Sequence, residues 1–231
     1  MTFSNLNDNS ETTLVGVPTS GTQFPGRESS VPHPRPVIGL VGQVCSGKSA
    51  VAEAFGKLGA RIYDADKAVH ALYERPDVTR EVAAMFGSAV LDADGKVDRK
   101  ALARIVFNDR SQLVRLTQGI IFPRTGAEMQ KAIEDFKNSD ATVLVLDAPA
   151  LFESGRQDTC DTIVYVAAPL ERREAWARKR GWIPGEIARR EGMLENDDEK
   201  RRRADAIIMN DGTLDEVERQ AGRLMRLWTM Q

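Results

Sequence analysis

The chain has 231 residues, of which 42% are hydrophobic, 29% charged and 6% aromatic, which excludes a wholly disordered or fibrous protein. Its formal net charge of −2 argues against a general nucleic-acid-binding protein, whose domain is usually strongly basic. Its two cysteines are too few for a disulfide framework, and no apolar run approaches the length of a membrane span. We therefore expect a cytoplasmic protein that binds neither nucleic acid nor membrane.

The N-terminal 36 residues differ in composition from the rest of the chain. Ser, Thr, Asn, Gly and Pro occupy 21 of these 36 positions. Such a segment buries too little apolar surface to offset the entropy that it would lose on ordering. We predict a disordered tail over residues 1–36 and one folded domain over residues 37–231.

Short apolar runs alternate with helical patterns through this domain. Residues 37–41 lie between Pro36 and Gly42 and predict a buried strand, and residues 48–58 follow with the apolar spacing of a helix. Further strands are predicted at residues 61–63, 142–146, 162–166 and 206–209, and later helices at residues 170–180, 184–193, 197–204 and 214–228. The alternation predicts an α/β fold built on a five-stranded parallel sheet.

A long insertion separates the second and third predicted strands. Residues 66–137 have a mainly helical and charged pattern. Its breaks fall at Pro76, at Gly87 and at the turn over residues 92–95. We expect a helical subdomain here.

Residues 42–49 match the phosphate-binding pattern G-x-x-x-x-G-K-[ST], directly after a predicted strand and at the start of a predicted helix. The glycines let backbone N–H groups turn toward a phosphate, and the helix N-terminus adds the positive end of its dipole. Lys48 supplies a mobile charge to the β- and γ-phosphates, and the Ser49 hydroxyl is placed to ligate Mg²⁺. The predicted nucleotide-binding residues are Gly42, Val44, Cys45, Ser46, Gly47, Lys48 and Ser49.

Two aspartates, Asp64 and Asp66, follow the second predicted strand. Residues at the carboxyl ends of parallel strands face the ligand crevice of an open α/β sheet. Because one residue separates the two, we expect one carboxylate to face the phosphates and the other to cap the next helix. The first would accept a proton from an attacking hydroxyl. A purely structural turn or N-cap is the alternative.

Asp147 ends the third predicted strand. An acid at this place could bind the hydration shell of Mg²⁺, as a Walker-B aspartate does. A strand-end turn residue is the alternative, and Glu153 is a weaker candidate for the same role.

Residues 171–203 contain 11 Lys or Arg among 33 positions, with eight Asp or Glu interspersed. A solvated helical face would have this composition. A lid that closes arginines over the transferring phosphoryl group would have it too. The pattern alone leaves both interpretations open.

Five stretches of the domain carry a resemblance to a known family. They are residues 38–49; residues 58–66, which end in Asp-Ala-Asp; a middle region with Phe86-Gly87 and residues 99–107; residues 147–153; and residues 200–210, with Ala204-Asp205 and Asn210. In this order they resemble the dephospho-CoA kinase family, which catalyses the last step of coenzyme A biosynthesis. Residues 147–153 are similar to its Asp-x-Pro-Leu-Leu-Phe-Glu stretch.

The resemblance implies a P-loop NTPase fold of the nucleoside- and nucleotide-kinase type. It implies a helical CoA-binding insertion at about residues 67–137 and a lid at about residues 170–200. It also implies ATP and Mg²⁺ as cofactors and phosphorylation of the 3′-hydroxyl of dephospho-CoA, by a monomer or small homo-oligomer. The roles implied for single residues are a general base for Asp66, further catalytic residues in Lys48 and Arg190, metal binding for Ser49 and Asp147, and an adenine-side loop for Asn210.

The chain departs from the family pattern at several positions. Gln43 and Cys45 stand where the family usually has glycine, Phe122 stands in place of a histidine, and Leu194 stands in place of a glutamine. The lid positions are contested by Arg173, Arg178, Lys179 and Arg180, and Ala175 occupies one expected arginine position. These departures leave the phosphate loop intact and bear on acceptor positioning and turnover.

An active kinase for dephospho-CoA is the leading hypothesis. The alternatives are a catalytically weak paralogue that binds nucleotide as a sensor or partner, and a P-loop kinase for another small acceptor. A GTPase is disfavoured because the chain has no Asn-Lys-x-Asp motif for guanine.

Overall fold

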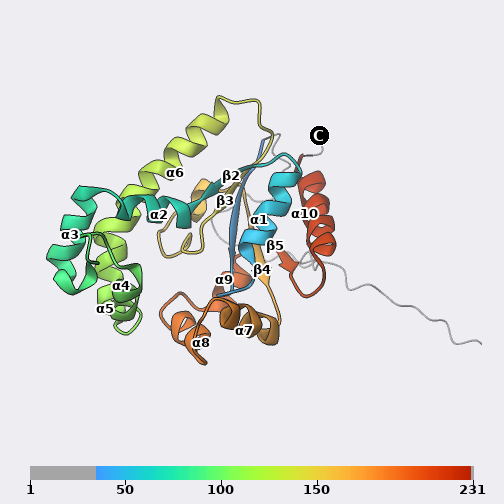
Figure 1. Ribbon diagram of the computed structural model, residues 1–231. Coiled ribbons are helices and arrows are strands. Elements are labelled where there is room, and N and C mark those ends of the chain that lie inside the picture. Colours follow the sequence, from blue (N-terminus) through green and yellow to red (C-terminus); the bar gives the residue numbers. More distant parts are fainter. Residues whose placement is uncertain (1–34, 230–231) are drawn as a thin grey trace, which may run out of the picture.

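The computed structural model describes residues 35–229, and Figure 1 shows how its elements are arranged. Apart from Arg35 and Pro36, the predicted tail lies outside the described residues. Arg35 donates hydrogen bonds from Nη2 to the carbonyl oxygens of Phe136 (2.6 Å) and Ser139 (2.5 Å). Pro36 accepts a bond from the Leu144 N–H. The described chain therefore begins attached to the segment just before the third strand.

Five parallel strands form one sheet in the order β2-β3-β1-β4-β5, which confirms the predicted fold class. The strands are β1 (Val37–Gly42), β2 (Arg61–Asp64), β3 (Leu144–Asp147), β4 (Thr162–Ala167) and β5 (Ala206–Met209). In the register, Asp147 lies beside Leu40 of β1 on one side and beside Asp64 of β2 on the other. The sheet thus brings two aspartates to the edge at which β1 ends.

The third strand begins later than the apolar run predicts. Val143 is fully buried and its carbonyl accepts from the Arg61 N–H, but the paired residues begin at Leu144 and include Asp147. Burial without strand pairing occurs where the chain enters the sheet from a loop. The apolar run therefore predicts that a strand lies here but not the residue at which it begins.

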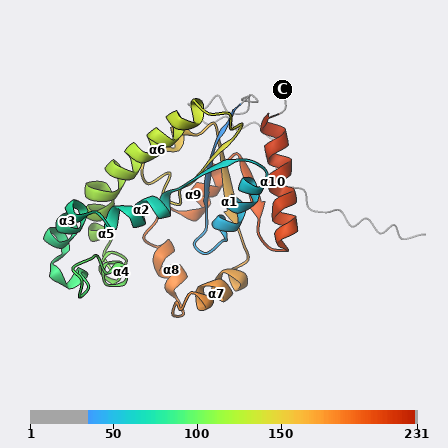
Figure 2. The ribbon, with the colours of Figure 1, turned by 45° about the horizontal axis from the view of Figure 1, so that its top comes forward.

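Helices cover both faces of the sheet, as Figure 2 shows. On one face, α1 (Lys48–Lys57) and α10 (Leu214–Thr229) pack on Ile38, Leu40 and neighbouring residues of β3, β4 and β5. On the other face, α6 (Phe122–Lys137) packs through Met129, Ile133 and Phe136. The sheet is buried on both sides, which explains why its strands read as continuous apolar runs.

The insertion between β2 and α6 has its own apolar core. It consists of α2 (Ala65–Tyr73), α3 (Pro76–Phe86), α4 (Arg99–Val106) and α5 (Arg110–Leu116), followed by a π-helical segment, Thr117–Ile121. Its core includes Leu72, Val82, Leu102 and Ile120. Pro76 opens α3 and Gly87 ends it at a φ of 85°, as the predicted breaks require. In Figure 1 this subdomain projects to one side of the sheet.

Three helices lie between β4 and β5. They are α7 (Leu170–Lys179), α8 (Glu186–Glu191) and α9 (Asp197–Arg202). α8 is shorter than the predicted helix over residues 184–193 because Gly185, with a φ of 83°, turns the chain at its N-terminus. Figure 1 shows α7 and α8 below the carboxyl ends of the strands, where the predicted lid would lie.

None of the helices within residues 35–229 is long and apolar enough to cross a membrane.

Phe55 is fully buried between α1, the sheet and α10. We expect Phe55→Ala to lower the free energy of unfolding by about 3–5 kcal/mol, because truncation leaves a cavity that neighbours fill only in part. Equilibrium urea denaturation measures this loss. Lys57→Ala, at the end of the same helix as Phe55, removes an exposed ion pair with Glu218 of α10 and is the control with a much smaller effect. Similar losses for both variants would contradict the assignment of Phe55 to the core.

Candidate active site

The loop between β1 and α1 has the backbone of a phosphate cradle. Gly42 has a φ of 149° and Gly47 a φ of 83°, conformations that favour glycine. A Cβ at Gly42 would collide with the Val166 carbonyl, and one at Gly47 would collide with the Asn210 side chain. Gly42 is therefore required by close packing against backbone, Gly47 by packing against a side chain, and both by their backbone conformation.

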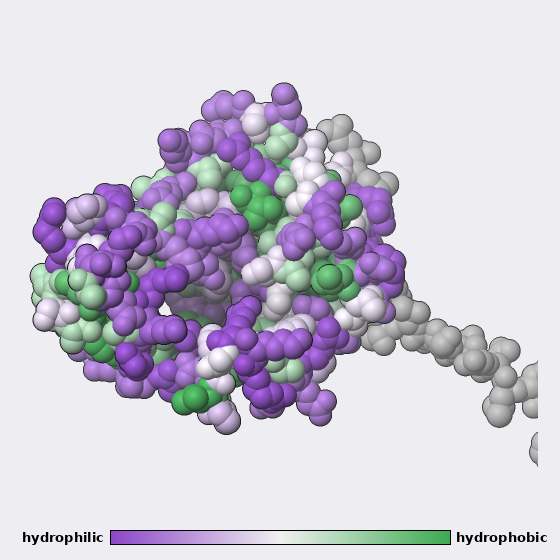
Figure 3. Space-filling view, in the orientation of Figure 1, coloured by the Kyte–Doolittle hydropathy of each residue, from purple (hydrophilic) through white to green (hydrophobic). Residues whose placement is uncertain are grey.

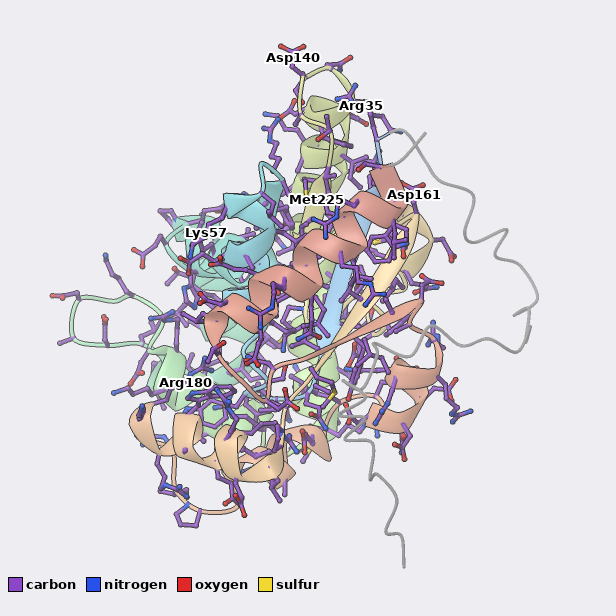
Figure 4. The ribbon with its side chains drawn as sticks, turned by 90° about the vertical axis from the view of Figure 1, so that its right-hand side faces the viewer. Arg35, Lys57, Asp140, Asp161, Arg180 and Met225 are labelled. Carbon is purple, nitrogen blue, oxygen red and sulfur yellow. The ribbon has the colours of Figure 1, made fainter. Side chains whose placement is uncertain are left out.

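Cys45 adopts a φ of 60°, which is uncommon for a residue with a side chain. The residue is buried and packs with Ala177 of α7 and Ile187 of α8. Arg180 lies beside it, with Nη1 at 3.7 Å from Sγ, and Figure 4 labels Arg180 at the end of α7. The cysteine thus packs between the phosphate loop and these two helices.

Lys48 lies at the start of α1 and its ammonium is close to two carboxylates. Its Nζ donates to the Gln43 carbonyl at 3.2 Å, inside the loop. Burial lowers the pKa of Lys48, whereas the charges of Asp147 and Asp66 oppose that shift. The predicted catalytic lysine and the two predicted acidic residues therefore share one electrostatic site.

Asp64 and Asp66 divide their roles through a helix start. Asp64 is the N-cap of α2, and its Oδ1 accepts from the Lys67 N–H at 2.9 Å. Asp66 lies in the first turn of α2, exposed to solvent and in electrostatic contact with Lys48. The sequence argument assumed an extended strand to separate the two carboxylates. In the structure the helical turn of α2 separates them.

Asp147 is 7% exposed, and its Oδ1 has no hydrogen-bond partner within the part of the chain that the structure describes. Burial, with smaller contributions from Asp66 and Asp64, raises the pKa of Asp147 to about 6, against the effect of Lys48. A buried carboxylate oxygen without a partner needs a cation or a proton. This place in the site therefore suits a positive ligand.

The residues predicted to bind Mg²⁺ fit a hard cation. Ser49 is exposed at the first turn of α1, and Asp147 offers its unpartnered oxygen at the end of β3. Both supply oxygen donors, which Mg²⁺ prefers, and Mg²⁺ usually keeps waters in place of further protein ligands. Within residues 35–229 no cluster of three His, Cys, Asp or Glu side chains could hold a metal alone. The donor set therefore suits a magnesium ion that a bound phosphate also ligates.

Asn210 follows β5 and closes the other side of the loop. It is 3% exposed, its Nδ2 donates to the Ser46 carbonyl at 2.9 Å, and its N–H donates to the Ala167 carbonyl at 2.7 Å. Trp176 of α7 also approaches Gly47, and Arg172 lies over its ring at 5.0 Å. These aromatic and cationic side chains were missed by the sequence analysis, because only the fold brings α7 to the loop.

The lid arginines separate into distinct environments. Arg173 is buried, with Nη1 at 2.5 Å from Glu191 and 3.3 Å from the Val44 carbonyl. Arg178 is exposed and reaches only Glu174 on its own helix, at 3.9 Å. Of the contested lid positions, Arg173 and Arg180 therefore touch the phosphate loop in this structure.

Arg190, the predicted catalytic arginine, joins the lid to the insertion. Its guanidinium lies 4.0 Å from the Trp182 ring and 4.5 Å from the Phe107 ring, and its Nε donates to Glu186 at 2.7 Å. Neighbouring Arg189 donates to Asn108 at 2.6 Å. The structure thus places Arg190 at a contact between α8 and the end of α4.

A buried ion pair that the sequence did not single out lies behind the site. Lys200 of α9 is 3% exposed and its Nζ is 2.5 Å from Glu153 Oε1, and its charge reaches Lys48. Glu153 therefore holds α9 through this ion pair. In the sequence Lys200 begins a basic run, which hides its burial.

Figure 3 shows a hollow between the insertion and the body of the molecule, above the lid. Asp66 lies in the first turn of the insertion, Lys48 at the start of α1 and Asp147 at the end of β3. An acceptor held between the insertion and the sheet would therefore meet the exposed carboxylate of Asp66 next to the phosphate loop.

Comparisons with known proteins show the family to which the chain belongs. The profile of a family described as Dephospho-CoA kinase matches residues 36–216. The dephospho-CoA kinase of Aquifex aeolicus is 36% identical over 188 residues, covering 81% of this chain and 94% of that protein. That of Corynebacterium diphtheriae is 38% identical over 197 residues, covering 84% and 98%.

Solved structures give the same result. The crystal structure of TT1252 from Thermus thermophilus is similar with a TM-score of 0.67 and 31% identity, over 83% of this chain and 96% of that one. A dephospho-CoA kinase from Campylobacter jejuni has a TM-score of 0.58 at 21% identity, over 82% and 95%. The latter likeness supports the fold.

We expect Asp147→Asn to stabilise the metal-free protein. The pKa of about 6 lies above the ordinary 3.8, so the folded state keeps its proton between these values and loses stability as the pH rises through about 6. The two proteins should unfold with nearly the same free energy near pH 4, and the variant should be more stable by about 3 kcal/mol above pH 7. Chemical denaturation with a chelator present measures the difference.

The control is Asp140→Asn, an exposed carboxylate that Figure 4 shows at the tip of the loop after α6. It should change stability little at any pH. An Asp147→Asn protein less stable than the wild type at pH 8 would show that Lys48 fully compensates the buried charge.

Proposed function

Because this chain belongs to the dephospho-CoA kinase family, we propose that it transfers the terminal phosphoryl group of ATP to the 3′-hydroxyl of dephospho-CoA, the final step of coenzyme A biosynthesis. The observation that carries the proposal is the electrostatic site that joins Lys48 of the phosphate loop to Asp66 and Asp147. This site combines a loop suited to a triphosphate with the exposed carboxylate of Asp66, which an acceptor can reach.

The phosphate loop would hold the donor. The N-terminus of α1, with its free backbone N–H groups, would bind the phosphates, and residues 42–49 contain no negative side chain. Lys48, now resting on the Gln43 carbonyl, has a phosphate oxygen as a stronger partner. Asn210 holds the Ser46 carbonyl away from the phosphates, so the loop presents its donors.

Ser49 and Asp147 would hold Mg²⁺, and the unpartnered Oδ1 of Asp147 supports this assignment. When bound, the ion would neutralise charge on the β- and γ-phosphates.

Asp66 would act on the acceptor. Its carboxylate accepts the proton of the 3′-hydroxyl as that oxygen forms a bond to the γ-phosphorus and the bond from the γ-phosphorus to the β-γ bridging oxygen breaks. ADP is the leaving group, and the products are ADP and the 3′-phosphorylated acceptor. The exposed position of Asp66 at the start of the insertion supports this role.

The lid would exclude water and add positive charge. Arg173 and Arg180 already contact the loop at Val44 and Cys45. Arg190 is the arginine that the family resemblance favours for catalysis, and its link to Glu186 must loosen before it can reach a phosphate. The expected cytoplasmic location, and the expectation of a monomer or small homo-oligomer, stay predictions.

An acceptor panel tests the function. With ATP and Mg²⁺, release of ADP should depend on dephospho-CoA and respond hardly at all to AMP, adenosine or shikimate. Phosphorus NMR of the product should place the new phosphate on the 3′-oxygen. Tight ATP binding without a response to any acceptor would favour the nucleotide sensor instead, and a stronger response to another acceptor would favour a different kinase.

Two substitutions separate phosphate binding from proton transfer. Lys48→Ala should abolish detectable turnover and weaken ATP binding, because it removes the charge that the loop presents. Asp66→Asn should lower kcat by about 10²–10⁴ and change the Kd for ATP little, because it removes only the proton acceptor. Steady-state kinetics and calorimetric titration with ATP measure these effects.

Asp94→Asn, in the exposed turn of the insertion, is the matched control and should keep wild-type kinetics. If Asp66→Asn lost ATP binding and kcat to the same degree, Asp66 would not be the base.

A further inference from the structure

The phosphate-binding pattern allows any residue at position 43. The Gln43 side chain nevertheless forms hydrogen bonds to residues outside the phosphate loop. Its Oε1 accepts from the Ala168 N–H, just after β4, at 3.1 Å. Its Nε2 donates to Asp197 Oδ2, at the start of α9, at 3.2 Å. One side-chain amide therefore joins the phosphate loop to both ends of the segment that contains the lid.

The backbone of the same residue holds the catalytic lysine. The Gln43 carbonyl accepts from Lys48 Nζ at 3.2 Å and from the Ser46 N–H at 3.2 Å, and its N–H donates to the Val166 carbonyl at 3.2 Å. A shift of Gln43 would thus move the carbonyl that orients Lys48. The side-chain contacts decide where that carbonyl lies.

Asp197, the partner of the Gln43 Nε2 group, lies where it can hold α9 in place. Asp197 is the first residue of α9, where the helix dipole favours a carboxylate. It adjoins the buried Tyr165 of β4, whose pKa burial and the Asp197 charge raise. One turn later, Lys200 of the same helix is buried against Glu153 and reaches Lys48 electrostatically. The position of α9 therefore affects two cations of the site.

We propose that Gln43 is a positioning residue that fixes the phosphate loop to the start of α9 and thereby sets the place of Lys48 for ATP. A glycine here, as the family usually has, would leave Ala168 and Asp197 without this partner. The catalytic consequence of this inference rests on the proposed function. Its test needs only a measurement of ATP binding.

The test introduces one negative charge and then restores the hydrogen bond. In Gln43→Glu a carboxylate oxygen replaces the Nε2 group that donates to Asp197. Two acidic side chains then lie at hydrogen-bonding distance. We expect the Kd for ATP with Mg²⁺, measured by calorimetric titration, to rise about 10-fold, within the coupling range of contacting residues. The KM for dephospho-CoA should change less than about 3-fold, since the acceptor side is untouched.

The double variant Gln43→Glu with Asp197→Asn decides the mechanism. The new asparagine donates to the glutamate, so ATP affinity should return to within about 3-fold of the wild type. Asp197→Asn alone keeps a Gln–Asn hydrogen bond and should also stay close to the wild type. Failure of the double variant to recover would overturn the proposal, as would unchanged ATP affinity in Gln43→Glu.

Gln130→Glu is the matched control. Gln130 donates to Glu134 at 3.2 Å on the exposed face of α6, so the change creates the same acid–acid contact away from the loop. It should leave ATP affinity unchanged. A fall in thermal stability of Gln43→Glu with full ATP affinity would show a structural role only. If the wild type binds ATP but does not phosphorylate dephospho-CoA, the proposed function fails while the Gln43 experiment still gives its answer.

Discussion

The close packing of the two loop glycines after β1 is the constraint on which the rest of the site depends. Gly42 lies against the backbone of Val166 in β4, and Gly47 lies against the side chain of Asn210 after β5, with no room for a Cβ at either. The loop between the two glycines leads directly into the start of α1. Lys48 and Ser49 are placed by that helix start, so their positions follow from the two glycines.

The charges around this loop are balanced at close quarters. Two lysines, Lys48 and Lys200, lie within electrostatic reach of each other, and Asp66, Asp147 and Glu153 offset them. Burial makes each unpaired charge costly, which is why the carboxyl of Asp147 holds its proton to a higher pH than usual.

The departures from the family pattern are compensated locally. Cys45 takes a strained φ, but its side chain fills a seam with Ala177 and Ile187 that a glycine would leave empty. Gln43 replaces a glycine with an amide that satisfies Ala168 and Asp197. Both residues increase the contact between the phosphate loop and the lid segment, so this chain holds its lid more through side chains than a glycine-rich loop would.

The sequence by itself determined the five strands, the phosphate-loop motif and the presence of a helix N-cap among Asp64 and Asp66, because these depend on local periods and local turn chemistry. Only the tertiary structure decided that Asp147 lies between β1 and β2, that Glu153 pairs with Lys200, and that Arg190 lies between Phe107 and Trp182. Each of these contacts joins segments far apart in the chain. Hydrophobic periodicity shows which face of an element is buried but does not specify its partner, and strand order and ion pairing arise only when the elements pack.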